Sequence, residues 1–330
     1  MPVLCSIFRK PNPEFFSIER VFASISAWLD PAYEQERVTL PYYNSSFSGI
    51  FRNLRFARRL RAGIYHVTGD VHYAVLALPR NRTVLTVHDC VFLNRPPGLK
   101  RTLLKWIFLD WPVRYCPVIT TISEATKRDI VKYTGCRPDK IVVIPNPLND
   151  GIYYTPAAFS ESCPEILFLG CTPNKNLARV IPALEGIPCR LVIVGQVPVE
   201  HQKLLQQYKI NYVHRVNLTD RELADQYAAA DLVLFPSTFE GFGLPVAEAQ
   251  AAGRPVVTSD LSPMKEVAGG AACLVDPYDV GSIREGVLSV ITKADYRQEL
   301  VEKGLVNIRR FRAEEIAGRY AEIYKKTLSY

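Results

Sequence analysis

Short apolar runs alternate with longer amphipathic stretches along most of the chain. Runs such as Thr83–His88 and Val118–Ile122 are apolar at consecutive positions, so both faces of these strands are expected to be buried, as in a parallel sheet. The stretches between the runs place apolar residues three or four positions apart, which is typical of helices with one buried face. The alternation predicts α/β domains built from repeated strand–helix units.

The first half of the chain shows the pattern in six predicted strands and four predicted helices. The strands are expected at Val3–Phe8, Arg37–Leu40, Gly63–Thr68, Thr83–His88, Val118–Ile122 and Ile141–Ile144. The helices are expected at Glu14–Leu29, Phe47–Arg61, Leu99–Tyr115 and Ser123–Tyr133. The last helix has the best start and stop signals, because Ser123 precedes Glu124 and Gly135 follows the helix.

A break at Pro145–Gly151 can continue neither a helix nor a central strand, so we place a linker at about 145–160. Beyond it the strands are expected at Glu165–Leu169, Arg190–Val194, Tyr212–Arg215, Leu232–Phe235, Pro255–Thr258 and Ala272–Val275. Helices are expected at about 175–185, 198–208, 220–230, 244–252, 263–268, 279–292, 295–308 and 313–328.

This order predicts two doubly wound parallel sheets, in domains 1–150 and 151–330. The last helix, 313–328, can pack back on the first domain. In such sheets ligands bind outside the carboxyl ends of the strands. Two facing domains would therefore form a cleft, with the functional residues just after the strands.

Charge separates the two halves. The net charge is +7, and residues 1–150 hold 21 Lys and Arg against 12 Asp and Glu. This basic half favours an anionic partner, for which an anionic membrane is one candidate. No apolar run reaches the roughly 18 residues that span a bilayer, and the apolar N-terminal stretch precedes Arg9, the reverse of a signal peptide. We expect a cytoplasmic protein, with the inner face of the membrane as an alternative location.

Metal chemistry and nucleic-acid binding find no support in the sequence. The eight cysteines form no CxxC pair, and the five histidines add no zinc pattern, so no metal site is expected. No nucleic-acid motif accompanies the basic residues. A dehydrogenase is disfavoured as well, because no GxGxxG follows a predicted strand.

The most informative segment runs from Phe235 to Gly253, between a predicted strand and the end of the next helix. Its glycines let the backbone approach a ligand, and the free amides at the helix start attract anions or electron-rich oxygens. Glu240 and Glu248 flank this helix start and can both face the cleft, with Glu240 deeper and Glu248 further out. Carboxylates there are suited to accept hydrogen bonds from sugar hydroxyls.

A second segment, Leu167–Leu177, repeats the arrangement of strand, glycine and helix start. Lys175 is expected in the first turn of the helix, where a cation opposes the helix dipole. That unfavourable position suggests a role such as meeting a phosphate. The alternative is an ordinary exposed lysine.

These two segments resemble the corresponding motifs of retaining glycosyltransferases of family 4, in the GT-B class of two facing Rossmann-like domains. The resemblance implies transfer of a hexose from a UDP- or GDP-linked sugar to a hydroxyl of a glycan or lipid-linked acceptor, without metal or cofactor. An enzyme with such an acceptor would take part in polysaccharide or lipopolysaccharide biosynthesis. A nucleotide-sugar epimerase or hydrolase, or a non-catalytic sugar-nucleotide binding protein, is the alternative on the same fold.

The resemblance also implies roles for individual residues. Glu240 would hold the donor sugar, Lys175 the diphosphate and Glu248 the ribose, while His88 would approach the sugar from the first domain. We expect His88, Lys175 and Glu240 to be the catalytic residues. The full set expected to bind the donor is Gly170, Asn174, Lys175, Gly195, Arg215, Val216, Glu240, Gly241, Phe242, Gly243, Leu244 and Glu248.

The chain departs from the family in two places. Family members usually carry an arginine shortly before the lysine, whereas Cys171–Asn174 precede Lys175 here. Many members also have a glycine-rich loop after the first strand, but the stretch Arg9–Arg20 contains no glycine. Side chains would have to replace the close backbone contact. The residues expected on the acceptor side are Arg9, Lys10, Asp70, His72 and Asp89.

The predicted helix Phe47–Arg61 combines apolar residues with five arginines at 52, 55, 58, 59 and 61. Its residues Ile50, Leu54, Ala57 and Leu60 can share one face. The helix is either a core helix with a solvated basic side or a surface that meets anionic or phosphorylated lipid. Exposed Phe and Leu beside the arginines would favour the second interpretation.

Overall fold

A computed structural model describes the chain except for residues 12–16, 94, 95, 97, 150 and 330. The chain forms two compact units. Unit 1 comprises Met1–Pro147 with Arg312–Tyr330, and unit 2 comprises Leu148–Phe311. The expected start of a helix at Glu14 lies outside the described residues, as do parts of the loop Arg9–Arg20. Among the helices that are described, none has both the length and the apolar composition needed to cross a bilayer.

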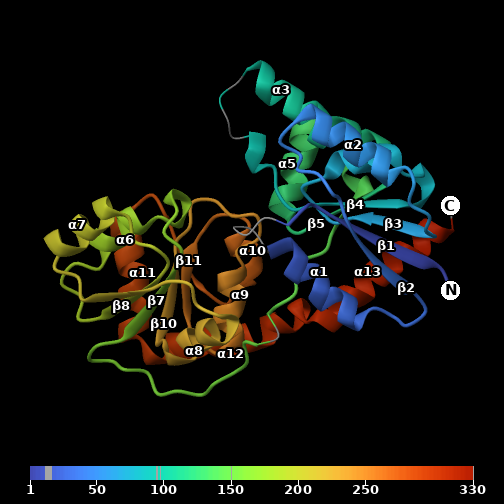
Figure 1. The fold of residues 1–330 in the computed structure, drawn as a ribbon. Coiled ribbons are helices and arrows are strands. Elements are labelled where there is room, and N and C mark those ends of the chain that lie inside the picture. Colours follow the sequence, from blue (N-terminus) through green and yellow to red (C-terminus); the bar gives the residue numbers. More distant parts are fainter. Residues whose placement is uncertain (12–16, 94–95, 97, 150, 330) are drawn as a thin grey trace. The chain divides into compact units, whose positions relative to one another are not determined.

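Unit 1 contains a six-stranded parallel sheet with the order β2-β1-β3-β4-β5-β6 (Figure 1). Its strands are β1 (Val3–Phe8), β2 (Glu34–Thr39), β3 (Ile64–Val67), β4 (Thr83–Val87), β5 (Val118–Thr121) and β6 (Ile141–Val143). The central strands β3 and β4 are buried at every position, as the consecutive apolar residues predict. Edge strand β2 begins three residues before its predicted start because its exposed polar residues carry no apolar signal.

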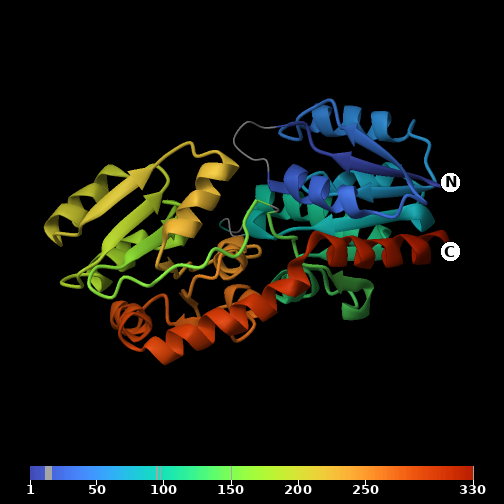
Figure 2. The same ribbon diagram turned by 90° about the horizontal axis from the view of Figure 1, so that it is seen from below.

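Helices cover both faces of this sheet. One face carries α2 (Phe47–Ala57), α4 (Trp111–Tyr115) and α5 (Glu124–Thr134), and the other carries α1 (Ser17–Trp28) and α13 (Ala313–Leu328). Figures 1 and 2 show α13, in red, along the sheet of unit 1 although it comes from the end of the chain. Its residue Tyr324 forms a 2.7 Å hydrogen bond with Nδ1 of buried His66, whose Nε2 lies 2.7 Å from Oγ1 of Thr86.

Unit 2 contains a second six-stranded parallel sheet, with the order β12-β11-β10-β7-β8-β9. The strands are β7 (Glu165–Leu169), β8 (Arg190–Val194), β9 (Tyr212–Arg215), β10 (Leu232–Phe235), β11 (Val256–Ser259) and β12 (Cys273–Val275). The helices are α6 (Leu177–Ala183), α7 (Val199–Gln207), α8 (Asp220–Ala229), α9 (Leu244–Ala251), α10 (Met264–Ala268), α11 (Val280–Thr292) and α12 (Ala294–Asn307). Two doubly wound parallel sheets are therefore confirmed.

The predicted helix Leu99–Tyr115 is interrupted. It begins as α3 (Leu99–Lys105), passes through a π-helical turn at Trp106–Asp110 and ends as α4. The side chain of Lys105 donates hydrogen bonds of 2.9 and 2.8 Å to the carboxylate of Asp110, across the wide turn. A further 3₁₀ helix at His72–Ala77 was not predicted, and it contains the expected acceptor-side residue His72.

Helix α2 also differs from its prediction. Ala57 is buried as expected, but Ile50, Leu54 and Leu60 are only partly buried against the core. The residues that face directly inward are Gly49, Asn53 and Ala57. The amide of Asn53 donates 2.8 Å hydrogen bonds to the carbonyl of Tyr42 and the hydroxyl of Tyr73. The hydrogen bonds of buried Asn53 therefore hold the helix in place, whereas the sequence pattern predicted that a row of apolar side chains would do so.

Candidate active site

Two loops of unit 2 lie side by side at the carboxyl edge of its sheet, because they follow the neighbouring strands β7 and β10. Two groups of the loop after β10 contact the loop after β7. The backbone nitrogen of Thr238 and Oγ of Ser237 each lie 2.8 Å from the carbonyl oxygen of Asn174. Both predicted segments therefore meet in one place.

Asn176 holds the two loops together. Its side chain is 2% exposed and donates hydrogen bonds to the carbonyls of Pro236 at 3.0 Å and Pro277 at 2.6 Å. Its backbone is left-handed with φ +72°, a conformation that Asn tolerates better than most residues. The side chain thus supplies hydrogen bonds to carbonyl groups of irregular loops, which no neighbouring strand or helix satisfies.

Glu240 is the centre of the site. Its Oε1 accepts three hydrogen bonds, from Nζ of Lys175 at 2.6 Å, Oγ of Ser237 at 2.6 Å and Nδ2 of Asn174 at 3.2 Å. The side chains of Lys175 and Glu240 are 19% and 15% exposed, so both charges are largely shielded and stabilise each other. Among the described residues, Oε2 of Glu240 has no protein partner, so it can accept a hydrogen bond from a ligand.

Lys175 does not lie in the first turn of a helix, and this expectation was wrong. It ends a 3₁₀ turn, Pro173–Lys175, and α6 begins at Leu177. The side chain crosses Gly170, where a Cβ would come within 3.0 Å of its carbons, and the ammonium group lies 4.6 Å from the centre of the Phe235 ring. Carboxylate and ring, rather than a helix dipole, set its environment.

The start of α9 presents backbone donors beside this pair. Gly243 is the N-cap residue, has φ +91° and supplies no side-chain cap, and Pro245 stands at the start of the helix. The preceding Phe242 is 6% exposed and packs edge-on against Phe311 at 5.6 Å between ring centroids. The first amides of the helix, from Gly243 and Leu244, are therefore held in place by a buried aromatic contact.

Glu248 lies one turn into α9 but is more buried than expected. It is 6% exposed, and its Oε2 accepts a 2.7 Å hydrogen bond from the hydroxyl of Tyr227. Burial raises the pKa of Glu248 from 4.5 to about 7; the Tyr227 hydrogen bond opposes this rise and the charge of Asp220 adds to it. Glu248 is thus more buried than Glu240, and the expected order of the two carboxylates in the cleft stays a prediction.

The other residues that were expected to bind the sugar-nucleotide donor lie at or after the ends of β8, β9 and β10 of the same sheet. Gly195 follows β8 with φ +137°, and a Cβ there would approach Sγ of Cys171 to 3.2 Å. Arg215 and Val216 are exposed at the end of β9, and Val216 is 41% exposed. Gly241 belongs to the loop between Glu240 and the helix start. No side-chain contact joins Arg215 to the Lys175–Glu240 pair among the described residues.

His88 lies in unit 1, directly after β4. Its Nε2 is 2.7 Å from the carbonyl oxygen of Thr68, so Nε2 carries a proton and donates it. Burial lowers the pKa of His88, and the nearby carboxylates of Asp70 and Asp89 oppose that shift. The imidazole is therefore neutral at physiological pH, with Nδ1 as its acceptor atom.

Arg9, Lys10 and Asp70 are brought together at the carboxyl edge of the unit 1 sheet. Arg9 forms an ion pair with Asp70 and a 3.1 Å hydrogen bond from Nε to Glu19. Lys10 lies 4.5 Å from the ring centre of Tyr43. These three residues line a pocket of about 210 Å³ together with Tyr42, Tyr43, Asn44 and Val71.

His72 and Asp89 do not join that pocket. His72 is 5% exposed, and its Nδ1 lies 2.6 Å from the carbonyl oxygen of Phe108. The carboxylate of Asp89 accepts a 2.9 Å hydrogen bond from the backbone of Val91. Both side chains have local structural partners, which favours a structural role.

Three residues of the site were not singled out in the sequence: Ser237, Asn176 and Tyr227. Ser237 and Asn176 lie within the two segments that the sequence singled out. Their position in the loops after β10 and β7 was the only indication that they belong to the site. Tyr227 lies 21 positions before Glu248 in another helix, so no local pattern connects them.

The sequence matches models of two protein families. Residues 163–293 match the model described as "Glycosyl transferases group 1", and residues 11–151 match "Glycosyltransferase Family 4". The O-antigen chain mannosyltransferase B of Escherichia coli is 27% identical over 271 residues, which cover 74% of this chain and 70% of that protein.

Solved structures show the same fold. Sucrose-phosphate synthase from Thermosynechococcus elongatus has a TM-score of 0.79 and 15% identity, covering 100% of both chains. HepE from Anabaena in complex with UDP-glucose has a TM-score of 0.78 and 15% identity, covering 98% of this chain and 100% of that one. These similarities confirm the GT-B fold class.

Two family models thus cover both units, and the matched segments contain the loops that carry Lys175 and Glu240. The chain is a glycosyltransferase of the GT-B fold and belongs to the group 1, family 4 glycosyltransferases.

Proposed function

We propose that this enzyme transfers a hexose from a nucleoside-diphosphate sugar to a hydroxyl group of a glycan or lipid-linked acceptor, with retention at the anomeric carbon and without a metal ion. The observation that carries the proposal is the cluster of Lys175, Glu240 and the uncapped start of α9 at one edge of unit 2. It offers a cation, a carboxylate and backbone amides to one ligand.

The diphosphate would be bound by Lys175 and the first amides of α9. Both supply positive electrostatic potential, the lysine as a full charge and the helix start as a partial one. The chain lacks the family's usual arginine before Lys175, so the helix amides have a larger share of this task. Lys175 would then exchange part of its contact with Glu240 for phosphate oxygens.

The sugar and the ribose would each meet a carboxylate. Oε1 of Glu240 is held by three donors, which leaves Oε2 for a sugar hydroxyl. Glu248 is held through Oε2 by Tyr227, which leaves Oε1 for the ribose. In both cases the protein fixes one oxygen of the carboxylate and offers the other, so the side chain is oriented before the ligand binds.

The reaction needs no nucleophile from the protein. The acceptor oxygen forms a bond to the anomeric carbon while the bond from that carbon to the diphosphate oxygen breaks. The acceptor proton passes to the leaving diphosphate oxygen on the same face. Lys175 and the helix amides stabilise the negative charge that develops on the diphosphate, and neutral His88 of unit 1 helps to orient the sugar.

The name of the Escherichia coli relative supports mannose as the transferred sugar, and the UDP-glucose complex of HepE shows that a protein of this fold binds a UDP-hexose. We therefore propose GDP-mannose or UDP-glucose as the first donors to test.

The pocket of Arg9, Lys10 and Asp70 is proposed as part of the acceptor site. Two tyrosine rings, Tyr42 and Tyr43, contribute to its lining beside charged and amide groups. Aromatic rings that pack on a sugar and polar groups that bind its hydroxyls are the common elements of carbohydrate sites. The position of the pocket at the carboxyl edge of the sheet agrees with the rule for ligand sites in such folds.

Incubation of the purified enzyme with each donor, with and without glycan or lipid-linked acceptors, tests the proposal. We expect a glycoside product that forms only when acceptor is present and that keeps the anomeric configuration of the donor. The rate of its formation should be the same with and without EDTA. Rapid donor breakdown without acceptor would contradict transfer and indicate a hydrolase or epimerase. Tight donor binding without turnover on any acceptor would indicate a binding protein.

A further inference from the structure

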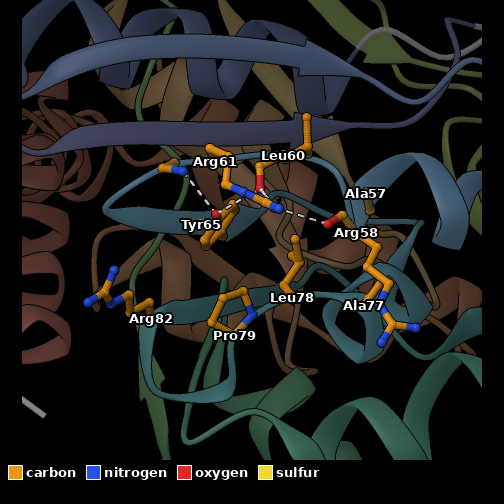
Figure 3. Close-up of a pocket in the computed structure, with 10 residues that line it drawn as sticks. Ala57, Arg58, Leu60, Arg61, Tyr65, Ala77, Leu78, Pro79 and Arg82 are labelled. Atoms are coloured by element: carbon orange, nitrogen blue, oxygen red, sulfur yellow. Dashed lines mark hydrogen bonds between the residues drawn. The ribbon is translucent and has the colours of Figure 1, made fainter.

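A second pocket of unit 1 lies at the opposite edge of the sheet from the proposed acceptor site. Apart from Tyr65, which lies near the start of β3, its lining residues come shortly before β3 or β4 in the chain, so the pocket stands at the amino ends of these strands (Figure 3). Its volume is about 450 Å³. Because ligands of the reaction are expected at the carboxyl ends, this pocket is not part of the catalytic site.

Three arginines give this pocket its charge. Arg58 and Arg82 flank it from opposite sides, and Arg61 lies between them with hydrogen bonds to the carbonyls of Arg58 at 3.2 Å and Leu60 at 3.0 Å (Figure 3). None of the described residues that line it is acidic. Across the described residues, no carboxylate forms an ion pair with any of the three. The lining also includes apolar residues, among them Leu78 and Pro79.

The helix that leads into this pocket exposes large apolar side chains. On α2, Phe47 is 66% exposed and Phe51 is 67% exposed. Phe47, Phe51, Arg55 and Arg58 follow one another at spacings of four, four and three residues, so they share the outward side of the helix. The outward side therefore passes from phenylalanine at its start to arginine at its end, beside the pocket.

The exposed phenylalanines are not needed to hold the helix. Its inward side is fixed by Gly49, where a Cβ would approach the carbonyl oxygen of Tyr43 to 2.2 Å, and by the hydrogen bonds of buried Asn53. Large apolar side chains that remain in water on a well-anchored helix mark a surface for another partner.

We propose that α2 and the arginine pocket form a docking surface for an anionic phospholipid bilayer, in which the pocket takes a lipid phosphate group. The phenylalanines enter the interfacial layer while the arginines bind phosphates, as in helices that lie in the plane of a membrane. A soluble anion would use the pocket but would leave Phe47 and Phe51 in water. The excess of basic residues in the first half of the chain adds a longer-range attraction.

Co-sedimentation of the whole protein with vesicles tests this docking surface and does not depend on transfer activity. We expect binding to vesicles that contain phosphatidylglycerol, little binding to phosphatidylcholine alone, and weaker binding in high salt because salt screens the charges. A double variant, R58E with R82E, should bind at least about tenfold more weakly, since each basic residue near an anionic surface contributes about a fivefold factor. A second double variant, F47S with F51S, should also weaken binding.

A matched control is available on the other face of the same sheet. Lys325 and Lys326 are exposed on α13, so K325E with K326E makes the same change of charge away from α2. We expect this control to bind vesicles almost like the wild type. Equal losses in the control and in the arginine variant would overturn the proposal, because net charge alone would then explain binding. It would also be overturned if wild-type protein ignored anionic vesicles, or if inorganic phosphate protected it from unfolding without any vesicle binding.

Discussion

The ammonium nitrogen of Lys175 lies 2.6 Å from Oε1 of Glu240, and this ion pair joins the loop after β7 to the loop after β10. Its two charges belong to the two motifs that identify the family, and each compensates the desolvation of the other. A donor diphosphate would compete with Glu240 for the lysine. If Lys175 binds the diphosphate as proposed, donor binding would free part of the Glu240 carboxylate for the sugar.

Removing either charge should impair transfer. We expect Lys175→Ala and Glu240→Ala each to lower turnover by at least about tenfold, or about 1.4 kcal/mol of activation free energy. Steady-state kinetics on the folded variants provide the measurement. Lys265→Ala is the control, because Lys265 forms an exposed ion pair with Asp260 in the same unit and should retain activity. Normal turnover of both site variants would refute their assignment.

Ser237 should act by positioning Glu240. Its hydroxyl lies 2.6 Å from Oε1 of Glu240 and 2.8 Å from the carbonyl of Asn174. Ser237→Ala should lower transfer less than Glu240→Ala does, and should cost about 1 kcal/mol of unfolding free energy because the hydrogen bond donated by the hydroxyl is lost. Ser237→Thr keeps a hydroxyl and should restore part of the activity. If Ser237→Ala reduced stability while kinetics stayed unchanged, the role would be structural only.

Glu248 should give unit 2 a pH-dependent stability. Burial raises the pKa of Glu248 from 4.5 to about 7, so the folded protein binds this proton more tightly than the unfolded chain does. Stability contributed by the protonated form is present at low pH and declines as pH rises from about 4.5 to about 7. In Glu248→Gln this decline should disappear. The difference in Tm between the variant and the wild type should therefore increase between about pH 4.5 and about pH 7. If that difference stayed constant over this pH range, the raised pKa of Glu248 would be contradicted.

Tyr227 should tune the same group. Its hydrogen bond to Oε2 favours the charged carboxylate and so opposes the rise in the pKa of Glu248. Tyr227→Phe should therefore move the pKa of Glu248 higher still. If Glu248 binds the ribose, the KM for donor will fall as pH rises through this pKa, and the midpoint will lie at higher pH in the variant. An unmoved midpoint would exclude this coupling.

The last helix should be essential to unit 1. Tyr324 of α13 is 1% exposed and pairs with buried His66. Tyr324→Phe leaves Nδ1 of His66 without its partner and should cost about 1–3 kcal/mol, while Tyr324→Ala should cost about 3–5 kcal/mol. Urea denaturation measures both. Tyr278→Phe, at a tyrosine that is 58% exposed, should change stability by less than about 0.5 kcal/mol.

Much of the fold could be predicted from the sequence because buried parallel strands leave a strong local signal. Strands β7, β8 and β10 have the predicted bounds, since each is a compact, largely apolar run between clear breaks. Strand β2 was harder because it lies at an edge with polar residues. The π-helical turn at Trp106–Asp110 could not be predicted, because an ordinary helical spacing precedes and follows it.

The candidate site was predictable where a motif carries it and not where tertiary packing decides. The proximity of Lys175 and Glu240 follows from two strand-end motifs on neighbouring strands. The burial of Glu248 depends on Tyr227 from another helix, and the inward side of α2 depends on Asn53 bonding to Tyr42. Such contacts between distant positions have no periodic signature. The surroundings of His72 were missed for the same reason.

The central claim is that Lys175 binds the diphosphate of a sugar nucleotide, and calorimetric titration tests it most directly. Wild-type protein, Lys175→Met and the control Lys265→Met would be titrated with UDP, GDP and the corresponding nucleosides. We predict that one nucleoside diphosphate binds the wild type and the control alike and binds Lys175→Met at least about tenfold more weakly, or by about 1.4 kcal/mol. Undiminished binding of that diphosphate to Lys175→Met would contradict the account.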